Sequence, residues 1–295
     1  MLEKKEFDIL ECLESTKEDL SQRKIAKLTK MSVGSVNQVW GRLIEKGFVC
    51  NGKITQLGLD ALEPYRVERA IIMAAGFGSR LVPITLNTPK PLIRVNGKRI
   101  IETILDALHD VGINEIYLVR GYLGSQFDDL LYKYPQIKFI DNPQYNEGNN
   151  IISVYLAREY IHNSYLIEAD LYVYNSKIIK KYQYQTNYLS MPVEKTDDWC
   201  FFTSGGCIYD YAIGGENCEK MVGISYWNNE DGAKLAEDIE KTYSAPGGKE
   251  RYWDEVPLKY YKNDFKIATI NVLDGDVVEI DTFNELKVID KTYNV

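Results

Sequence analysis

The spacing of hydrophobic residues changes near residue 66 and divides the chain into two parts. In the first part apolar residues recur every three or four positions, which predicts three amphipathic helices. Their apolar stripes are, in order, Phe7, Ile9, Leu10 and Leu13; Ile25, Ala26 and Leu28; and Val36, Val39, Trp40, Leu43 and Ile44. Ser21 and Ser32 precede the second and third stripes and can cap those helices.

A hairpin is predicted after the third helix. Residues 48–55 form two short runs around Asn51-Gly52, the favoured dipeptide of a two-residue hairpin turn. Three helices and a small β-wing predict a winged helix-turn-helix domain at residues 1–66. Pro64 discourages a helix from continuing beyond this domain.

Residues 67–295 alternate between strand-like and helix-like runs. The predicted strands are 70–75, 116–119, 137–140 and 165–167, and the predicted helices are 98–110, 124–133 and 151–160. This alternation predicts an α/β fold, a three-layer α/β/α Rossmann-like domain with a mainly parallel sheet. Ligands of such sheets bind beyond the carboxyl ends of the strands.

A glycine-containing segment follows the first predicted strand. It reads Ala74, Ala75, Gly76, Phe77, Gly78, Ser79 and Arg80. Bare backbone at Gly76 and Gly78 can approach a ligand closely, and its N–H groups can converge on phosphate oxygens. Arg80 and Lys90 add two cations. Since Leu81 stands where the dinucleotide fingerprint needs its third glycine, and no Walker Gly-Lys-Ser/Thr is present, the segment favours a nucleoside triphosphate, with a plain tight turn as the alternative.

Acidic residues lie at two further strand-like runs. Asp170 follows the run 165–167, and Glu279 and Asp281 alternate along 277–282, so that both project to one face. Magnesium is held in proteins by one or two carboxylates together with the phosphates of the substrate. A turn-capping aspartate and a solvated edge strand are the structural alternatives for these acids.

The glycine segment and the later run Asn87-Thr88-Pro89-Lys90-Pro91 resemble the signature of the nucleotidyltransferases that activate sugar phosphates and choline phosphate. Over about residues 69–290 the chain is most similar to the cytidylyltransferases that act on choline phosphate. This resemblance implies Mg²⁺-dependent transfer of CMP from CTP to phosphocholine, giving CDP-choline and pyrophosphate. It implies that Lys90 and Arg80 are the catalytic cations and that Asp170 and Asp281 hold the metal.

The resemblance also implies two sets of binding residues. The nucleotide contacts that it implies are Ala74, Ala75, Gly76, Phe77, Gly78, Ser79, Arg80, Gly121, Tyr122, Tyr145, Asn150 and Ser153. The acceptor contacts that it implies are Trp199, Tyr252, Asp254 and Glu279. Aromatic faces near carboxylates suit a quaternary ammonium group, which cannot donate hydrogen bonds. We assign Trp227, although it matches the family as well, to the core.

Composition narrows the functional classes. The chain has 295 residues, of which 45% are hydrophobic and 26% charged, as in soluble globular proteins. No apolar run is long enough to span a membrane and the N-terminus is charged, so we expect no membrane insertion and a cytoplasmic location. Five cysteines without a Cys-x-x-Cys pair and two histidines give little support to a disulfide framework, a zinc site or histidine-dependent catalysis.

Charge is distributed unevenly. Residues 20–54 contain seven Lys or Arg and one acid, whereas residues 1–68 contain eleven of each sign. This pattern suits DNA contact through the winged helix, with dimerisation and ligand sensing as alternatives. Phosphoethanolamine, 2-aminoethylphosphonate and a sugar 1-phosphate are alternative acceptors, and a nucleotide-sensing DNA-binding regulator is the alternative from another class. A homo-oligomer is compatible with the sequence.

Overall fold

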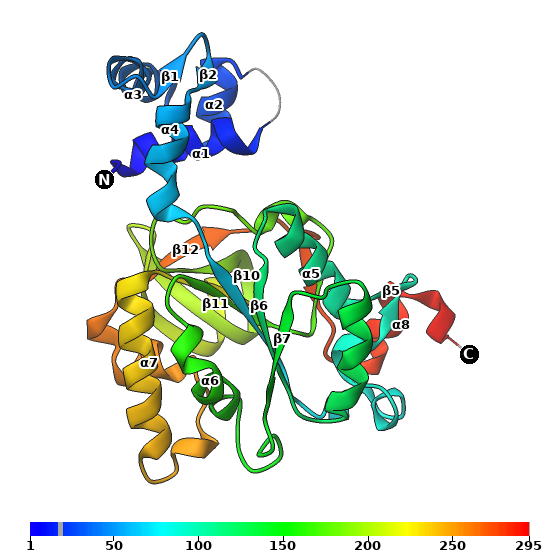
Figure 1. Cartoon of the computed structure of the whole chain (residues 1–295). Coiled ribbons are helices and arrows are strands. Elements are labelled where there is room, and N and C mark those ends of the chain that lie inside the picture. The colour runs from blue at the N-terminus through cyan, green and yellow to red at the C-terminus, as the bar shows by residue number, and fades with distance from the viewer. Residues whose placement is uncertain (17–19, 295) are drawn as a thin grey trace. The chain divides into compact units, whose positions relative to one another are not determined.

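The computed structural model forms two compact units (Figure 1), and describes residues 1–16 and 20–294. Unit 1 comprises Met1–Arg66 and Tyr182–Tyr184, and unit 2 comprises Val67–Lys181 and Gln185–Val295. The short segment of unit 1 beyond residue 180 has no signal in the sequence pattern. No helix among the described residues is long and apolar enough to cross a lipid bilayer.

Unit 1 is a winged helix-turn-helix. Its elements are α1 (Lys4–Ser15), α2 (Gln22–Leu28), α3 (Val33–Glu45), β1 (Val49–Cys50), β2 (Lys53–Ile54) and α4 (Gln56–Leu62). The predicted caps are confirmed, because the side chains of Ser21 and Ser32 accept hydrogen bonds from backbone N–H groups in the first turns of α2 and α3. The predicted hairpin is confirmed as β1 and β2, which pair antiparallel.

Two residues of the predicted apolar stripes in unit 1 are exposed, and two more, Leu13 and Trp40, are only partly buried. Leu28 is 54% exposed and Ile44 is 51% exposed. The core of unit 1 is formed by the remaining residues of the three stripes and by aromatic residues from both of its chain segments. Tyr184 stacks on Tyr65 with ring centroids 5.6 Å apart, and Tyr182 is almost fully buried.

Unit 2 contains a seven-stranded, mainly parallel sheet in the order β10-β12-β11-β8-β3-β6-β7. Its strands are β3 (Arg69–Ala74), β6 (Glu115–Arg120), β7 (Ile137–Asp141), β8 (Ser164–Glu168), β10 (Asn187–Ser204), β11 (Cys207–Trp227) and β12 (Ala268–Asn271). Strands β8, β3, β6 and β7 run parallel, whereas β11 is antiparallel to β8. Small two-stranded sheets pair β4 (Arg94–Val95) with β5 (Lys98–Arg99) and β9 (Leu171–Val173) with β13 (Val277–Glu279).

Helices cover both faces of this sheet, so the predicted three-layer fold is confirmed. They are α5 (Ile100–Asp110), α6 (Ile151–Ala157) and α7 (Asn229–Ser244), whereas α8 (Phe283–Ile289) packs through Leu286 in a separate cluster with Leu81 and Ile280. In β3, Ala70 and Ile72 pack in the core that contains α5, while Ile71 packs in the core that contains α6 and α7. Figure 1 shows α5 on one side of the sheet and α6 with α7 on the other. The strand period of two thus separates the two hydrophobic layers.

The segment predicted as a helix at residues 124–133 is a 3₁₀-helix, Gly124–Tyr132. Its two buried residues, Phe127 and Leu130, lie three positions apart, which matches the three-residue turn of a 3₁₀-helix. The helix is preceded by Leu123 in the left-handed conformation, with φ of 48°.

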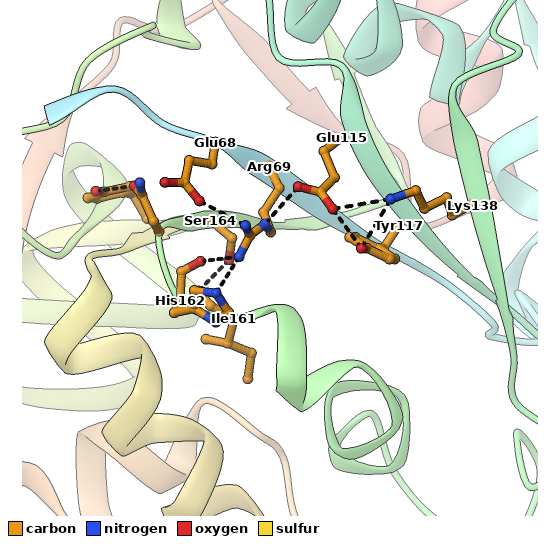
Figure 2. Close-up of polar contacts among 10 residues, drawn as sticks. Glu68, Arg69, Glu115, Tyr117, Lys138, Ile161, His162 and Ser164 are labelled. Atoms are coloured by element: carbon orange, nitrogen blue, oxygen red, sulfur yellow. Dashed lines mark hydrogen bonds and ion pairs between the residues drawn. The ribbon is translucent and has the colours of Figure 1, made fainter. Parts of the chain in front are cut away.

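Arg69 and Glu115 join the amino ends of β3 and β6 in a polar network (Figure 2). Arg69 donates to Glu115 at 3.1 Å, contacts His162 Nε2 at 2.6 Å and pairs with Glu68 at 2.8 Å. The hydroxyl of Tyr117 donates to Glu115 at 2.7 Å. The hydrogen bond from Tyr117, with those from Lys138 and Arg69, outweighs partial burial and lowers the pKa of Glu115 to about 2.

Replacing Glu115 by glutamine should therefore lower the melting temperature near pH 7 by a few degrees, equivalent to about 1 kcal/mol after solvent screening. Because the folded pKa lies below the ordinary value of 4.5, this stabilisation is present above pH 4.5 and is lost as the pH falls toward 2. In thermal unfolding, the difference in melting temperature between the variant and the wild type should become smaller below pH 5. Glu237→Gln is the control, since Glu237 is 73% exposed, and an equal, pH-independent shift in both variants would contradict this account.

Candidate functional site

The glycine segment leaves the carboxyl end of β3 as a loop over residues 75–78. Gly78 has φ of 65°, and a Cβ atom there would lie 3.1 Å from side-chain atoms of both Lys90 and Thr85. The Thr85 hydroxyl donates to the carbonyl of Gly78 at 2.9 Å. A side chain at position 78 would thus be strained and crowded, so glycine keeps the loop folded beside Lys90.

Three aromatic residues lie in this loop or beside it. The rings of Phe77 and Tyr122 lie 4.2 Å apart between centroids, and those of Tyr122 and Tyr145 lie 6.3 Å apart. The Tyr122 N–H donates to the carbonyl of Ala75 at 3.1 Å. A Cβ atom at Gly121 would meet Tyr145 at 2.6 Å, so a glycine is required where β6 ends. The structure therefore brings five predicted nucleotide contacts, Ala75, Phe77, Gly121, Tyr122 and Tyr145, together.

Asn150 and Ser153 are engaged within the fold. Asn150 Oδ1 accepts the backbone N–H of Trp253 at 3.0 Å, and Ser153 Oγ accepts from Asn142 at 3.1 Å. Ser153 is also buried. Both residues hold the segment between β7 and α6 in place, and direct nucleotide contact by either of them stays a prediction.

Lys90 connects the two predicted metal ligands. Its Nζ lies 2.8 Å from Asp170 Oδ2 and 2.8 Å from Asp281 Oδ1, although the three residues are far apart in sequence. Burial lowers the pKa of Lys90, but the charges and hydrogen bonds of the two aspartates outweigh it, and the pKa is raised. Arg80, 68% exposed, pairs with Asp281 at 2.9 Å. The predicted catalytic cations and metal carboxylates thus form one connected group.

Local hydrogen bonds fix Asp281 beside Asp170. The strand β13 ends at Glu279, earlier than the predicted run to 282, and the N–H of Ile280 then donates to the carbonyl of Asp170 at 3.1 Å. Glu285 in α8 accepts the N–H groups of Asp281 and Thr282, both at 2.8 Å. This capping box holds the segment that carries Asp281 at the start of α8.

Glu168, Asp170 and Glu279 form a carboxylate cluster in which one oxygen of each lies within 4.8 Å of the others. Asp170 Oδ1 is buried and lacks a hydrogen-bond partner among residues 1–16 and 20–294. An oxygen-only donor set with an unpaired buried oxygen fits a hard divalent cation. Glu168 is not among the metal ligands predicted from the sequence, although its place at the end of β8, two residues before Asp170, is a usable signal.

Burial shifts the pKa values of two acids of this cluster, Glu168 and Glu279, upward. Burial raises the pKa of Glu168 well above its ordinary value, and the charges of Asp170, Asp254 and Glu279 add to the effect. Burial and the charge of Asp170 raise the pKa of Glu279 to about 8. In contrast, Lys90 and Arg80 outweigh the burial of Asp281 and lower its pKa. A bound cation would compete with protons for Glu168 and Glu279.

Gly223 on β11 covers Glu168. A Cβ atom at this position would lie 2.4 Å from Glu168 Oε2, so no larger residue fits without displacing the carboxylate. Asp254, one of the predicted acceptor contacts, is only 4% exposed and accepts the hydroxyl of Tyr188 at 2.9 Å. Burial raises its pKa to about 7. Asp254 thus acts on Glu168 electrostatically from within the fold.

Trp199, Tyr211 and Tyr252 form an aromatic cluster. Trp199 stacks on Tyr211 with centroids 5.4 Å apart and meets Tyr252 edge-on at 5.5 Å. Tyr252 is 44% exposed. The β10–β11 pairing shifts register between Thr196 and Trp199, and such bulges redirect side chains. Tyr211, which the sequence analysis missed, is placed there by this irregular pairing.

Trp227 is fully buried, and its ring nitrogen donates to Ser225 at 3.0 Å, so its assignment to the core is confirmed. Trp253 is 2% exposed and packs in the same core. Only one of the three tryptophans in this half of the chain, Trp199, belongs to the aromatic cluster.

Known proteins match both units. Residues 69–191 match the family model for nucleotidyl transferases, and residues 2–49 match that for winged helix-turn-helix DNA-binding domains. The 2-aminoethylphosphonate cytidylyltransferase of Lancefieldella rimae is 35% identical over 229 residues, which cover 76% of this chain and 92% of that protein. This chain belongs to the nucleotidyltransferase family. The choline-phosphate cytidylyltransferase of Streptococcus pneumoniae is 32% identical to this nucleotidyltransferase over 228 residues, or 76% of this chain and 97% of the relative.

A solved structure gives the same result for the fold. The CTP:phosphocholine cytidylyltransferase of Streptococcus pneumoniae superimposes with a TM-score of 0.71 and 31% identity, covering 77% of this chain and all but 1% of that one. This nucleotidyltransferase is therefore similar to cytidylyltransferases over nearly their whole length, and carries a winged helix-turn-helix in addition.

Proposed function

We propose that this nucleotidyltransferase transfers CMP from CTP to phosphocholine, releasing pyrophosphate and giving CDP-choline. The observation that carries the proposal is the aromatic cluster, of which Trp199 and Tyr211 lie on the same β10–β11 hairpin that carries Gly223 against Glu168. A quaternary ammonium group is recognised by aromatic faces, and a phosphate is activated beside cations and a metal site. The similarity to two cytidylyltransferases supports CTP as the nucleotide.

The reaction needs no protein nucleophile. An oxygen of the acceptor phosphate attacks the α-phosphorus of CTP, a P–O bond forms, and the bond to the β-phosphate oxygen breaks as pyrophosphate leaves. The backbone of Gly76, Phe77 and Gly78 with Arg80 would hold the β- and γ-phosphates. Lys90 would stabilise the charge that builds on the α-phosphate. Mg²⁺ held by Asp170 and Asp281, with Glu279 and Glu168 nearby, would neutralise triphosphate charge when bound.

The acceptor 2-aminoethylphosphonate is a second candidate, favoured by the similarity to the 2-aminoethylphosphonate cytidylyltransferase of Lancefieldella rimae. A primary ammonium group needs acceptor oxygens. Near the aromatic cluster, however, Asp198 is paired with Lys220 at 3.0 Å and Glu255 with Lys259 at 2.8 Å. Incubation of the protein with each NTP and with phosphocholine, phosphoethanolamine, 2-aminoethylphosphonate and sugar 1-phosphates, following pyrophosphate release, tests both candidates. If none of the acceptors in the panel led to pyrophosphate release, the proposal would be refuted.

Replacing Trp199 by alanine should raise KM for phosphocholine about 10-fold and leave KM for CTP within about twofold. The physical reason is loss of the largest ring that can face the trimethylammonium group. Steady-state kinetics with each substrate varied in turn measure both constants. Tyr209→Ala is the control, because Tyr209 is an exposed aromatic residue of the same hairpin outside the aromatic cluster. Equal effects of Trp199→Ala on both KM values would remove the cation–π argument.

DNA binding by unit 1 is a further candidate, supported by the family match of residues 2–49. Two of the basic residues of this domain, Arg42 and Lys46, pair with Glu3, which precedes α1, and with Glu6 of α1. The exposed face of α3 instead presents Asn37 and Gln38, whose side chains can read base edges. A gel shift on upstream DNA, with and without CTP, separates a regulator from an enzyme whose added domain has another role.

A further inference from the structure

Lys220 stands between the aromatic cluster and the carboxylate cluster. On β11 it pairs in register with Cys200, the neighbour of Trp199. Its Nζ lies 3.0 Å from Asp198 Oδ2, and its charge also interacts with Glu279 and Asp281. The side chain is 34% exposed, so the ammonium group is accessible to a ligand.

Asp198 fixes the position of this lysine. One oxygen of Asp198 accepts the backbone N–H of Trp199 at 2.7 Å, and the other pairs with Lys220. Partial burial lowers the pKa of Lys220, but the hydrogen bond to Asp198 and the negative charges around it raise the pKa overall. Lys220 is therefore a charged residue held at a set place beside Trp199.

An acceptor that spans these clusters meets opposite electrostatic conditions at its two ends. Its cationic end faces aromatic rings, whereas its phosphate must approach Asp281, whose negative charge repels it. Lys90 and Arg80 are paired with Asp281 on the side of the glycine loop. Lys220 is a cation on β11, the strand that also carries Tyr211 of the aromatic cluster and Gly223 against Glu168.

We propose that Lys220 binds the phosphate or phosphonate group of the acceptor and directs it toward the α-phosphorus of CTP. This inference rests on the proposed function, because it assumes a phosphorylated amine as the acceptor. It adds a residue that neither the sequence motifs nor the predicted acceptor contacts included. A charge-assisted hydrogen bond of this kind changes affinity on the order of 10- to 100-fold.

Steady-state kinetics of the full chain test the inference, with Lys220→Gln, Lys220→Arg and the control Lys234→Gln. Lys234 is a half-exposed lysine of α7, paired with Asp264 at 3.2 Å. We expect Lys220→Gln to raise KM for phosphocholine at least 10-fold with KM for CTP within twofold, and Lys220→Arg to restore most of the loss. Choline, which lacks the phosphate, should inhibit the wild type and Lys220→Gln with equal Ki values.

The outcomes separate the two hypotheses. An unchanged acceptor KM in Lys220→Gln, a parallel rise for CTP, or a choline Ki that rises as much as the acceptor KM would overturn the role of Lys220 and leave the transferase activity standing. A wild-type protein that releases no pyrophosphate with any phosphorylated amine would overturn the proposed function, and this inference with it. If Lys220→Gln does not fold, as judged by its melting temperature, the acceptor KM of Lys220→Arg decides: a value equal to that of Lys234→Gln supports the role of charge, and a 10-fold higher value contradicts it.

Discussion

Replacing Lys90 by alanine is expected to lower kcat by about 10²- to 10³-fold while CTP still binds. Lys90 is buried, lies beside the glycine loop and contacts both aspartates, so it can stabilise charge on the α-phosphate as the new bond forms. The binding of CTP relies on the loop backbone and Arg80 as well, and should survive. Single-turnover kinetics and a direct CTP-binding measurement separate the two effects.

The control for this variant is Lys98→Ala. Lys98 is an exposed lysine that pairs with Asp106 on α5, outside the group around Lys90. Its removal should leave kcat within about twofold. Melting temperatures of both variants are needed, because removing Lys90 leaves Asp170 and Asp281 facing each other without their shared cation. Undiminished turnover in a folded Lys90→Ala protein would refute the catalytic role.

Replacing Asp170 by asparagine should abolish most of the activity, by about 10³-fold, and weaken divalent-ion binding. Asp170 supplies the buried, unpaired Oδ1 and is common to the carboxylate cluster and the ion pairs of Lys90. Asparagine keeps the shape but removes the negative charge that a hard cation needs. Titration with Mn²⁺ in the presence of CTP, followed by electron paramagnetic resonance, measures ion binding without relying on turnover.

Asp129→Asn is the matched control, since Asp129 is 67% exposed and pairs with Arg99 at 3.5 Å away from the cluster. It should bind Mn²⁺ like the wild type. If Asp170→Asn also bound Mn²⁺ with unchanged affinity, the ion would have to be held elsewhere, and the metal assignment would be wrong.

Residues at strand ends were the most predictable part of the site. Apolar runs identify buried strands, and parallel strands bring their carboxyl ends to one edge. The sequence alone therefore predicts the positions of the glycine loop and of Asp170. The contact of Lys90 with both aspartates does not follow from this rule, because Lys90 begins a 3₁₀-helix and Asp281 follows β13, which pairs with β9 outside the main sheet.

Residues placed by long-range pairing could not be predicted in this way. Glu168 meets Glu279 because β9 pairs with β13, and nothing in either segment encodes the other as its partner. Tyr211 reaches Trp199 through register shifts in the long β10–β11 hairpin, which a period of two cannot anticipate. Asn150 shows the opposite situation. Its polar side chain suggests a ligand contact in the sequence, but in the structure it accepts a hydrogen bond from the backbone N–H of Trp253.

The winged helix is tied to the rest of the polypeptide at two places. The chain leaves unit 2 after Lys181, contributes three residues to unit 1, and returns at Gln185 just before β10 begins. A protein shortened to start at residue 67 would turn the rings of Tyr182 and Tyr184 out to water, and a peptide ending at residue 66 would lack the ring on which Tyr65 stacks. Unit 1 is thus built from two chain segments, one of which lies inside the sequence of unit 2. A single cleavage of the chain therefore cannot give both units complete.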